Sequence, residues 1–599
     1  MLKWKEVMVK MSSSKLITNI WLRSIASVCL SLGLAAVLFA PRAHAASLTV
    51  SGGCSLNNAI TSINAASNTG GCTSTGSYGT NDTITLPSGT TTLAADLPAF
   101  TVAAKVVGAG KTSSIINANN HIGFNADFSS SNAGAFSYTF QDFTIQNAST
   151  YGMFIFRANA VTATNVQVLN SEMGAILGGV SNVVTNSRIA NNTYSGNIDP
   201  TNGPLVSSSY NQPGFAGLAL LALPNQPSDT PISTATNVVV ENNTSKFAGL
   251  YINNSYQTGS GDTGTMQASI TNSTIRSNNG TLFAGAGVSA GGPFATTELN
   301  LTLKAVTVAN NSVVPDQANP IGNNAFLLSA KPYIAGVFVY GKLSNTQTMV
   351  NITSTGNSVV DTVDDQLVLA GFLAAISAEG ASMSIINATI VNNSASQTQT
   401  NVLFSNLTTG FSTSFYGVKM GVDNTGFVFT NGVSAQNSII ANNQFNNVVG
   451  ACASVDKSVI GLAPGLVDLT PTDLGRNITD DPNCTGYNVV PNILSTLGPL
   501  QDNGGPVPTI ALLPGSPAIG YAQQVLGIST DARGIARPVT PDVGAYQTVL
   551  GANTDNPGGQ TNLPQLPDTG DNEYLYLLIG VVLIAGAVAA IRLQINKRS

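Results

Sequence analysis

The middle of the chain, from about residue 81 to 450, repeats one short phrase in which apolar or β-branched residues alternate with polar ones. Most copies begin with Asn and end with one or two Asn residues, and they lie at 165–170, 186–192, 237–243, 272–278, 305–311, 387–393 and 437–443. A period of two predicts half-buried strands. The closing Asn residues predict turns, because Asn tolerates left-handed backbone angles.

A phrase this short cannot bury its apolar face alone, so successive copies are expected to stack. Their spacing fits coils of roughly 20 to 30 residues with loop insertions. The pattern therefore predicts an all-β fold, a parallel β-helix solenoid over residues 81–450 with ladders of stacked Asn side chains. The insertions are predicted where Pro, Gly, Ser and Thr gather, at 196–232, 253–265, 314–334 and 396–425. The alternative is an array of immunoglobulin-like domains, which need a buried Trp that this region lacks.

Apolar runs without this alternation lie near both ends of the chain. Residues 1–45 combine a basic beginning, an apolar segment and Ala43-His44-Ala45, which predicts a secretory signal peptide cleaved between Ala45 and Ala46. A membrane helix is the alternative there, and either Met1 or Met11 can be the start.

Residues 574–591 are 18 residues without a charge, close to the minimum for a transmembrane helix. The basic tail 592–599 predicts a cytoplasmic C-terminus and an exported body.

A pentapeptide, Leu566-Pro567-Asp568-Thr569-Gly570, directly precedes this apolar run. The order of pentapeptide, apolar helix and basic stop resembles the LPxTG cell-wall sorting signal of sortase substrates. The resemblance implies that sortase cleaves between Thr569 and Gly570 and joins Thr569 to peptidoglycan, so that the membrane helix is temporary. The alternative is a permanent membrane anchor. Both place the preceding chain outside the cell.

Composition narrows the class of protein and its partners. Charged residues make up 9% of the chain and the net charge is −6, so no nucleic-acid partner is expected, because phosphate binding needs a basic face. Four of the five cysteines follow the signal peptide, in two local pairs, Cys54 with Cys72 and Cys452 with Cys484. An even count in an exported chain favours disulfides. Of the three possible pairings the local one closes the shortest loops, and no CxxC spacing favours zinc.

Both ends of the predicted solenoid carry further motifs. Residues 54–60, 64–67 and 81–90 resemble the N-terminal segment of bacterial surface proteins with a right-handed β-helix. Leu56, Ala59, Ile60 and Ile63 fall at helical spacing, so residues 46–80 are expected to hold a short amphipathic cap helix over the first coil.

The C-terminal motifs lie at 497–506, 511–519, 531–538 and 542–546. They are similar to the choice-of-anchor Q domain, which caps β-helix surface proteins before an anchor. The resemblance implies a β-rich cap over residues 451–548. Residues 549–565, rich in Gly, Asn, Pro and Thr, are then a flexible linker.

Candidate catalytic residues are sparse. Glycoside hydrolysis needs a carboxylate pair, and lyases need acids that hold Ca²⁺ beside a base. The densest acidic group, Asp361, Asp364 and Asp365, is interpreted as a solvated turn. Asp502 and Asp531 could bind a cation, but a turn and an ion pair with Arg533 explain them as well, and His121 is interpreted as structural.

No catalytic, cofactor or metal residues are therefore assigned, and no cofactor is expected. The predicted function is a sortase-anchored surface adhesin or structural rod with an extracellular protein or glycan as its ligand. A wall-tethered polysaccharide lyase or glycoside hydrolase is the alternative, and it rests on the fold class alone.

Overall fold

The structure is a computed structural model of the 599-residue chain. It describes residues 45–126, 135–194, 214–223, 229–253, 265–289, 298–315, 333–343, 345–361, 368–377, 382–397, 414–416, 428–430, 433–445, 447–449, 454–456, 466–468 and 472–549. By its contacts the chain divides into one unit up to Thr548 and a second from Val549. The predicted linker after Val549, the sorting motif 566–570, the apolar run 574–591 and the tail 592–599 lie outside the described residues, as do Cys452, Asp364 and Asp365.

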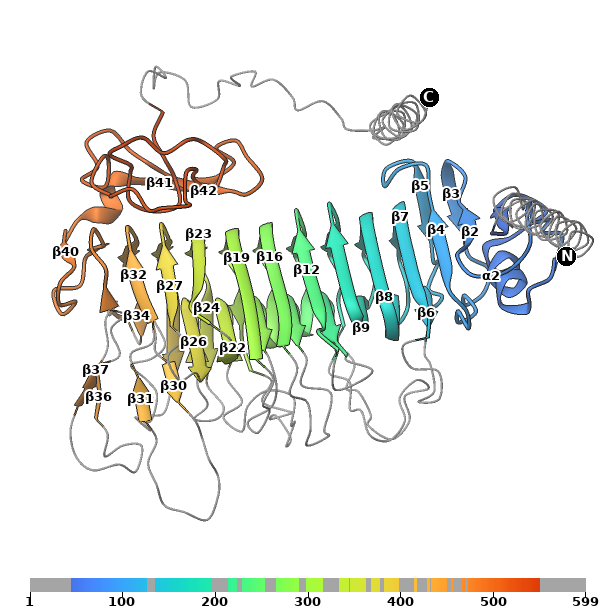
Figure 1. The fold of residues 1–599 in the computed structure, drawn as a ribbon, viewed down its shortest axis with the longest axis horizontal. Helices are drawn as coiled ribbons and strands as arrows, with labels where there is room; N and C mark the ends of the chain where they lie inside the picture. The colour runs from blue at the N-terminus through green and yellow to red at the C-terminus, as the bar shows by residue number, and fades with distance from the viewer. Residues whose placement is uncertain are drawn as a thin grey trace, which may run out of the picture. The chain divides into compact units, whose positions relative to one another are not determined.

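The first unit is an all-β structure, and its strands lie side by side in chain order (Figure 1). The larger of its two main sheets contains β1 (Ser47–Thr49), β2 (Asp82–Thr85), β3 (Gly89–Thr92), β4 (Ala104–Val107), β5 (Ser114–Asn117), β6 (Phe124–Ala126), β7 (Ser137–Gln146), β8 (Tyr151–Leu169), β9 (Met173–Thr185), β10 (Arg188–Ala190), β11 (Leu218–Ala222), β12 (Ile232–Thr236), β13 (Val239–Glu241), β15 (Leu250–Asn253), β16 (Thr265–Arg276), β18 (Ala286–Ser289), β19 (Glu298–Ala309), β22 (Val337–Leu343), β23 (Gln347–Thr355), β26 (Phe372–Ser377), β27 (Met383–Ile386), β28 (Thr389–Val391), β32 (Val433–Gln436), β33 (Ile439–Ala441), β38 (Thr472–Asp473), β39 (Ile478–Thr479) and β40 (Asn488–Val489).

The smaller sheet contains β14 (Thr244–Phe247), β17 (Asn279–Phe283), β20 (Ser312–Val313), β21 (Tyr333–Ile334), β24 (Ser358–Asp361), β25 (Val368–Leu369), β29 (Ser394–Gln397), β34 (Gln444–Phe445) and β35 (Val448–Val449). Three separate pairs are β30 (Ser414–Tyr416) with β31 (Val428–Thr430), β36 (Ser454–Asp456) with β37 (Leu466–Asp468), and β41 (Leu497–Gln501) with β42 (Thr509–Leu512). The strand pairings of the larger sheet are parallel, and in the smaller sheet only the pairing of β34 with β35 is antiparallel, among the described strands.

The recurring phrases pair with one another in register. The central residue of one copy lies opposite the central residue of the next, along the series Val168, Ile189, Val240, Ile275, Val308, Ser354, Ile390 and Ile440. The apolar members of this series are buried in one continuous core, and Ser354 is a buried polar residue in the same line. The alternating pattern thus sets which face of each strand is buried, and the in-register pairing gives each copy the neighbour it needs to cover that face.

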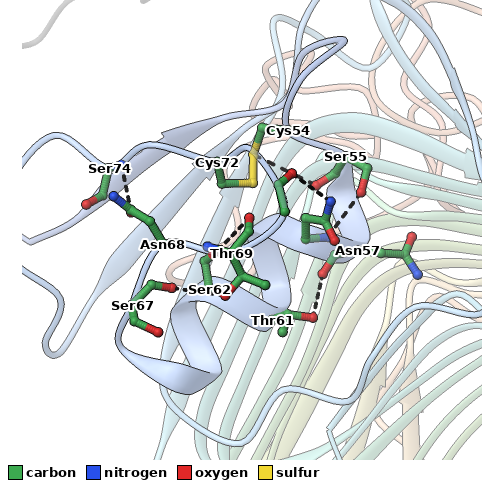
Figure 2. Close-up of a disulfide and its surroundings, with 12 residues drawn as sticks. Cys54, Ser55, Asn57, Thr61, Ser62, Ser67, Asn68, Thr69, Cys72 and Ser74 are labelled. Carbon is green, nitrogen blue, oxygen red and sulfur yellow. Dashed lines mark hydrogen bonds between the residues drawn. A yellow bond between two sulfur atoms is a disulfide. The ribbon is translucent and has the colours of Figure 1, made fainter.

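The N-terminal helix forms where its spacing predicts it. Helix α2 (Leu56–Ala65) buries Leu56, Ala59, Ile60 and Ile63. Ser55 is its N-cap and accepts the amide N–H of Asn58 at 3.2 Å, which satisfies one of the free donors of the first turn. A disulfide joins Cys54, two residues before the helix, to Cys72 beyond it (Figure 2). The disulfide therefore closes a loop that contains the whole helix.

A second repeat, which the sequence analysis missed, accompanies the Asn phrase. Each copy is an apolar residue followed by Ala and Gly, at 215–217, 247–249, 283–285, 334–336 and 369–371. The first four copies are buried, as are Ala370 and Gly371, and the rings of Phe215, Phe247 and Phe283 pack in series, with centroids 4.6 and 6.2 Å apart. They begin a second core cluster, separate from that of the Asn phrases.

Two of the predicted loop insertions are therefore partly wrong. The predicted loop 196–232 contains β11, which is buried along its whole length, and 314–334 ends in the buried strand β21. Gly is taken as a loop signal in 196–232. Gly217, directly before β11, is instead required because a Cβ there would overlap the carbonyl oxygens of Gly249 and Ala248, where neighbouring backbones approach closely.

The C-terminal segment after β40 is built mainly of turns. It holds one 3-10 helix, η4 (Ile493–Thr496), and the antiparallel pair β41 and β42, so it contains less strand than a β-rich cap would. The segment packs along the strands, and not only beyond the last of them (Figure 1). Its contacts reach β19, β23 and β28, far back along the sequence.

Candidate functional site

The predicted signal cleavage site lies at the N-terminal edge of the described fold. Ala45 is half-buried and pairs in a single parallel bridge with Ser77, whereas Ala46 is fully buried. The amide N–H of Ala46 donates to Oδ1 of Asp82 at 2.9 Å, and its carbonyl oxygen accepts from the amide of Thr83 at 2.8 Å. The residue that cleavage would place first is therefore already part of the core.

The two predicted disulfides differ in what the structure describes. Cys54 and Cys72 are bonded, with their Cα atoms 4.4 Å apart. Cys484 is buried and disulfide-bonded, while its predicted partner Cys452 is outside the described residues. The prediction of a bond between Cys452 and Cys484 thus stays a prediction.

The most regular polar feature is a ladder of buried Asn side chains, formed by Asn192, Asn243, Asn278, Asn311, Asn357, Asn393 and Asn443. Each Nδ2 donates to Oδ1 of the next member at 2.9 to 3.0 Å. The same Oδ1 accepts the backbone N–H of the preceding member, and Nδ2 also reaches a carbonyl oxygen of the preceding repeat. Every amide group in the middle of the ladder is thus fully hydrogen-bonded, which allows its burial.

The first Asn of each closing pair has a different role from the second. Asn191, Asn242, Asn310, Asn392 and Asn442 have left-handed backbones, with φ between 48° and 59°. Each precedes a ladder Asn. The first Asn therefore turns the chain and the second is buried, so the pair encodes a corner and a rung of the ladder at adjacent positions.

One charged cluster lies on the strands themselves. Glu241 is buried and contacts two arginines of neighbouring strands, Arg188 at 2.6 Å and Arg276 at 2.7 Å. Burial acts to raise the pKa of Glu241, but the hydrogen bonds and charges of Arg276 and Arg188 outweigh it, so the net pKa is lowered. The carboxylate therefore stays ionised at neutral pH and joins three successive repeats.

Asp361, Asp502 and Asp531, the acidic residues singled out from the sequence that the structure describes, lie in separate surroundings. Asp361 is buried at the end of β24, so its interpretation as a solvated turn is wrong. Asp502 accepts the amide N–H of Gly504 in a turn, and His121 lies 3.3 Å from Asp96. Within the described part of the chain, no three His, Cys, Asp or Glu side chains are grouped so that they could hold a metal ion.

Asp531 belongs to a buried network that fixes the C-terminal segment. Its Oδ2 accepts from Nε and Nη2 of Arg533 at 2.9 and 2.8 Å, and Arg533 also lies over the ring of Tyr546. Arg537 donates to the carbonyl oxygens of Asp542 and Gly544, and to Oδ1 of Asn351 on β23 at 3.2 Å. Burial lowers the pKa of Arg537 to about 10, against the opposing effect of Asp531 and Asp542, so it remains charged at neutral pH.

We expect Arg537→Met to loosen the C-terminal segment selectively. The buried carbonyl oxygens of Asp542 and Gly544 would lose their donors, at about 1–3 kcal/mol each. Hydrogen exchange of residues 531–547 should accelerate, while exchange in β13 and β16 stays unchanged. Arg476→Met is the matched control, because Arg476 is exposed and only lies over Tyr521, so it should change stability by less than about 0.5 kcal/mol. Equal effects of the two variants would contradict this role of Arg537.

A shallow polar groove of about 440 Å³ lies along the corners of the earlier repeats. It is lined by Asn120, Ala148, Ser149, Asn170, Ser171, Glu172, Asn191 and Thr193. Burial raises the pKa of Glu172, which is the one carboxyl among these lining residues. Amide and hydroxyl groups of this kind can hydrogen-bond a polar ligand, whereas two-carboxyl glycoside hydrolysis would need a second acid facing the first.

Comparison with protein families, with curated proteins and with solved structures gives no match for this chain. The part of the chain that the structure describes contains no helix of the length and hydropathy needed to cross a bilayer. The predicted membrane segment 574–591 lies outside that part.

Proposed function

We propose that the chain is a sortase-anchored surface protein whose body is a right-handed parallel β-helix, serving as an adhesin or structural rod that meets an extracellular protein or glycan. The in-register parallel pairing of successive phrases supports the β-helix. The ladder of buried Asn side chains supports it as well, because each rung needs a copy on both sides.

The sequence of the two ends supports export and anchoring. An N-terminal signal peptide would be removed after Ala45, and the pentapeptide 566–570 would be cleaved after Thr569 and joined to peptidoglycan, once the helix 574–591 has held the chain in the membrane. Only 9% of the residues are charged, and five charged side chains of the described body pair with one another, in the Glu241 cluster and in the Arg533–Asp531 pair, so few charges are left for electrostatic recognition. Contacts to a ligand would therefore be mainly hydrogen bonds from exposed amides and hydroxyls.

The pentapeptide can be tested directly, because the chain offers a matched control. Pro567→Ala should abolish the wall-linked form in a sortase-positive host, since it alters the motif at its Pro. Pro564→Ala changes a neighbouring Pro outside the motif and should leave wall linkage unchanged. The measurement is release of the protein by a muramidase, with mass spectrometry of the C-terminal peptide, which should end at Thr569. Equal wall linkage in both variants, or none in the native chain, would contradict the proposal.

A further inference from the structure

The amide of Ala46 occupies an unusual position for a residue next to a cleavage site. Ala46 has no exposed surface, and its N–H points to Asp82, which is 1% exposed. The amide N–H of Gly79 donates to both carboxylate oxygens of Asp82 at 3.2 Å. This carboxylate is therefore buried among backbone donors, one of which is the residue that signal cleavage would make the N-terminus.

We propose that removal of the signal peptide creates a buried ion pair between the new α-ammonium group of Ala46 and the carboxylate of Asp82, so that processing locks the first strand of the mature protein. The inference rests on the proposed cleavage after Ala45. Hydrolysis of the Ala45–Ala46 amide by water gives the carboxyl of Ala45 and the amine of Ala46, which is protonated at neutral pH. The nitrogen keeps its place 2.9 Å from Oδ1, and a neutral hydrogen bond becomes a charge-assisted one.

The surroundings of this pair favour a strong interaction. Ala46 is fixed by the amide of Thr83 bonding to its carbonyl oxygen at 2.8 Å, and β1 pairs with β2 from Ser47 onward. The new ammonium therefore loses little freedom when it meets Asp82, and water does not compete for the buried carboxylate. An opposite charge at this site offsets the cost of burying an ionised Asp.

The other charged groups near the pair are few. On the described elements that pack against β2, strand β1 and helix α2 carry no charged side chain, and β4 carries Lys105. Lys105 lies opposite Thr83, and Thr83 points to the other face of β2 from Asp82. Tyr78 precedes the turn that Gly79 forms with Asp82. The α-ammonium is thus the cation placed to neutralise Asp82.

The test compares two proteins, residues 46–548 and residues 45–548, each released by cleavage from an N-terminal fusion partner. Ala46 is the free N-terminus in the first, whereas in the second it is joined through a peptide bond to Ala45. The Ala46 form should exchange the amide hydrogens of Leu48 and Ile84 at least about tenfold more slowly at about pH 7. The α-amino pKa is about 8 before pairing, and pairing with Asp82 raises it, so this extra protection should be fully present below about pH 8 and should decline as the pH rises from about 8 to about 10 and the ammonium loses its proton. In the Asp82→Asn background the two forms should behave alike across this pH range.

Two measurements keep this inference distinct from the proposed function. Equal exchange in the 46–548 and 45–548 forms with Asp82 would overturn the ion pair. A difference between the two forms that persists in Asp82→Asn would also overturn it. If Asp82→Asn does not fold, the pH dependence of exchange in the two forms with Asp82 decides. N-terminal sequencing of the exported protein tests cleavage separately. A mature terminus other than Ala46 would overturn both the processing step and the inference, whereas Ala46 without the exchange difference would overturn the inference alone.

Discussion

Replacing Gly285 by Ala is expected to disrupt the repeats around it, at about 4 kcal/mol or more, which is at the upper end for a single substitution. A Cβ at this position would overlap the carbonyl oxygens of Gly336 and Ala335, and both belong to backbone. The oxygen of Gly336 also accepts the amide N–H of Ala286 at 3.0 Å, so it cannot move away without breaking that bond. Gly217, Gly249 and Gly336 meet the same obstacle in their own repeats.

The measurement is chemical unfolding, together with hydrogen exchange to locate the loss. Gly52→Ala is the matched control, because a Cβ there would have no atom within 4 Å and the backbone φ is not positive. It should change stability by less than about 0.5 kcal/mol. A Gly285→Ala protein as stable as the Gly52→Ala protein would show that the repeats are not packed backbone to backbone at this line of glycines.

Replacing Asn311 by Asp should cost about 3–5 kcal/mol at neutral pH, the range for an uncompensated buried charge. Asn311 donates through Nδ2 to Oδ1 of Asn357 and to the carbonyl oxygen of Ile275. A carboxylate has no proton to donate, so oxygen would face oxygen at both contacts. Burial and these acceptors would raise the pKa of the new carboxyl in the folded state. The destabilisation is therefore fully present above that raised pKa and shrinks as the pH falls through it.

Unfolding by denaturant at two pH values tests this expectation. The control is Asn310→Asp, the same substitution one residue earlier, at an exposed left-handed position with φ of 54° that Asp also tolerates. It should have little effect at either pH. If Asn311→Asp were no worse than Asn310→Asp, or if its cost did not fall on acidification, the ladder would not be what holds these repeats in register.

The sequence predicted the Asn features well because each has a local cause. The turn at Asn242 needs only a residue that tolerates positive φ, and the rung at Asn243 needs only a neighbouring copy of the same residue. The same holds for α2, whose apolar spacing and Ser55 cap lie within ten residues of each other. The helix agrees with its pattern at each predicted buried position, whereas the pattern did not distinguish the turning Asn from the ladder Asn and gave no copy of the phrase at Asn357, which also belongs to the ladder.

The second repeat, an apolar residue followed by Ala and Gly, was missed for a physical reason. Gly is both the usual signal of a loop and the residue that allows close backbone contact, and a single sequence does not distinguish the two. The position of the C-terminal segment was beyond prediction for another reason. Its contacts join residues far apart in the chain, as in the 2.7 Å bond from Thr307 Oγ1 to the carbonyl oxygen of Pro508, and no local pattern encodes them.

The C-terminal segment bonds to consecutive repeats, at Thr307, Asn351, Thr389 and Asn437. The spacing of these four bonding residues along the repeats is fixed by the C-terminal segment. Duplication or deletion of a repeat between 307 and 437 would therefore move some of the four away from their hydrogen-bond partners. Repeats that precede Thr307 have no such bonds to the segment among the described residues. Gain or loss of whole repeats, and hence variation in length, should therefore be tolerated on the N-terminal side of Thr307 and selected against beyond it.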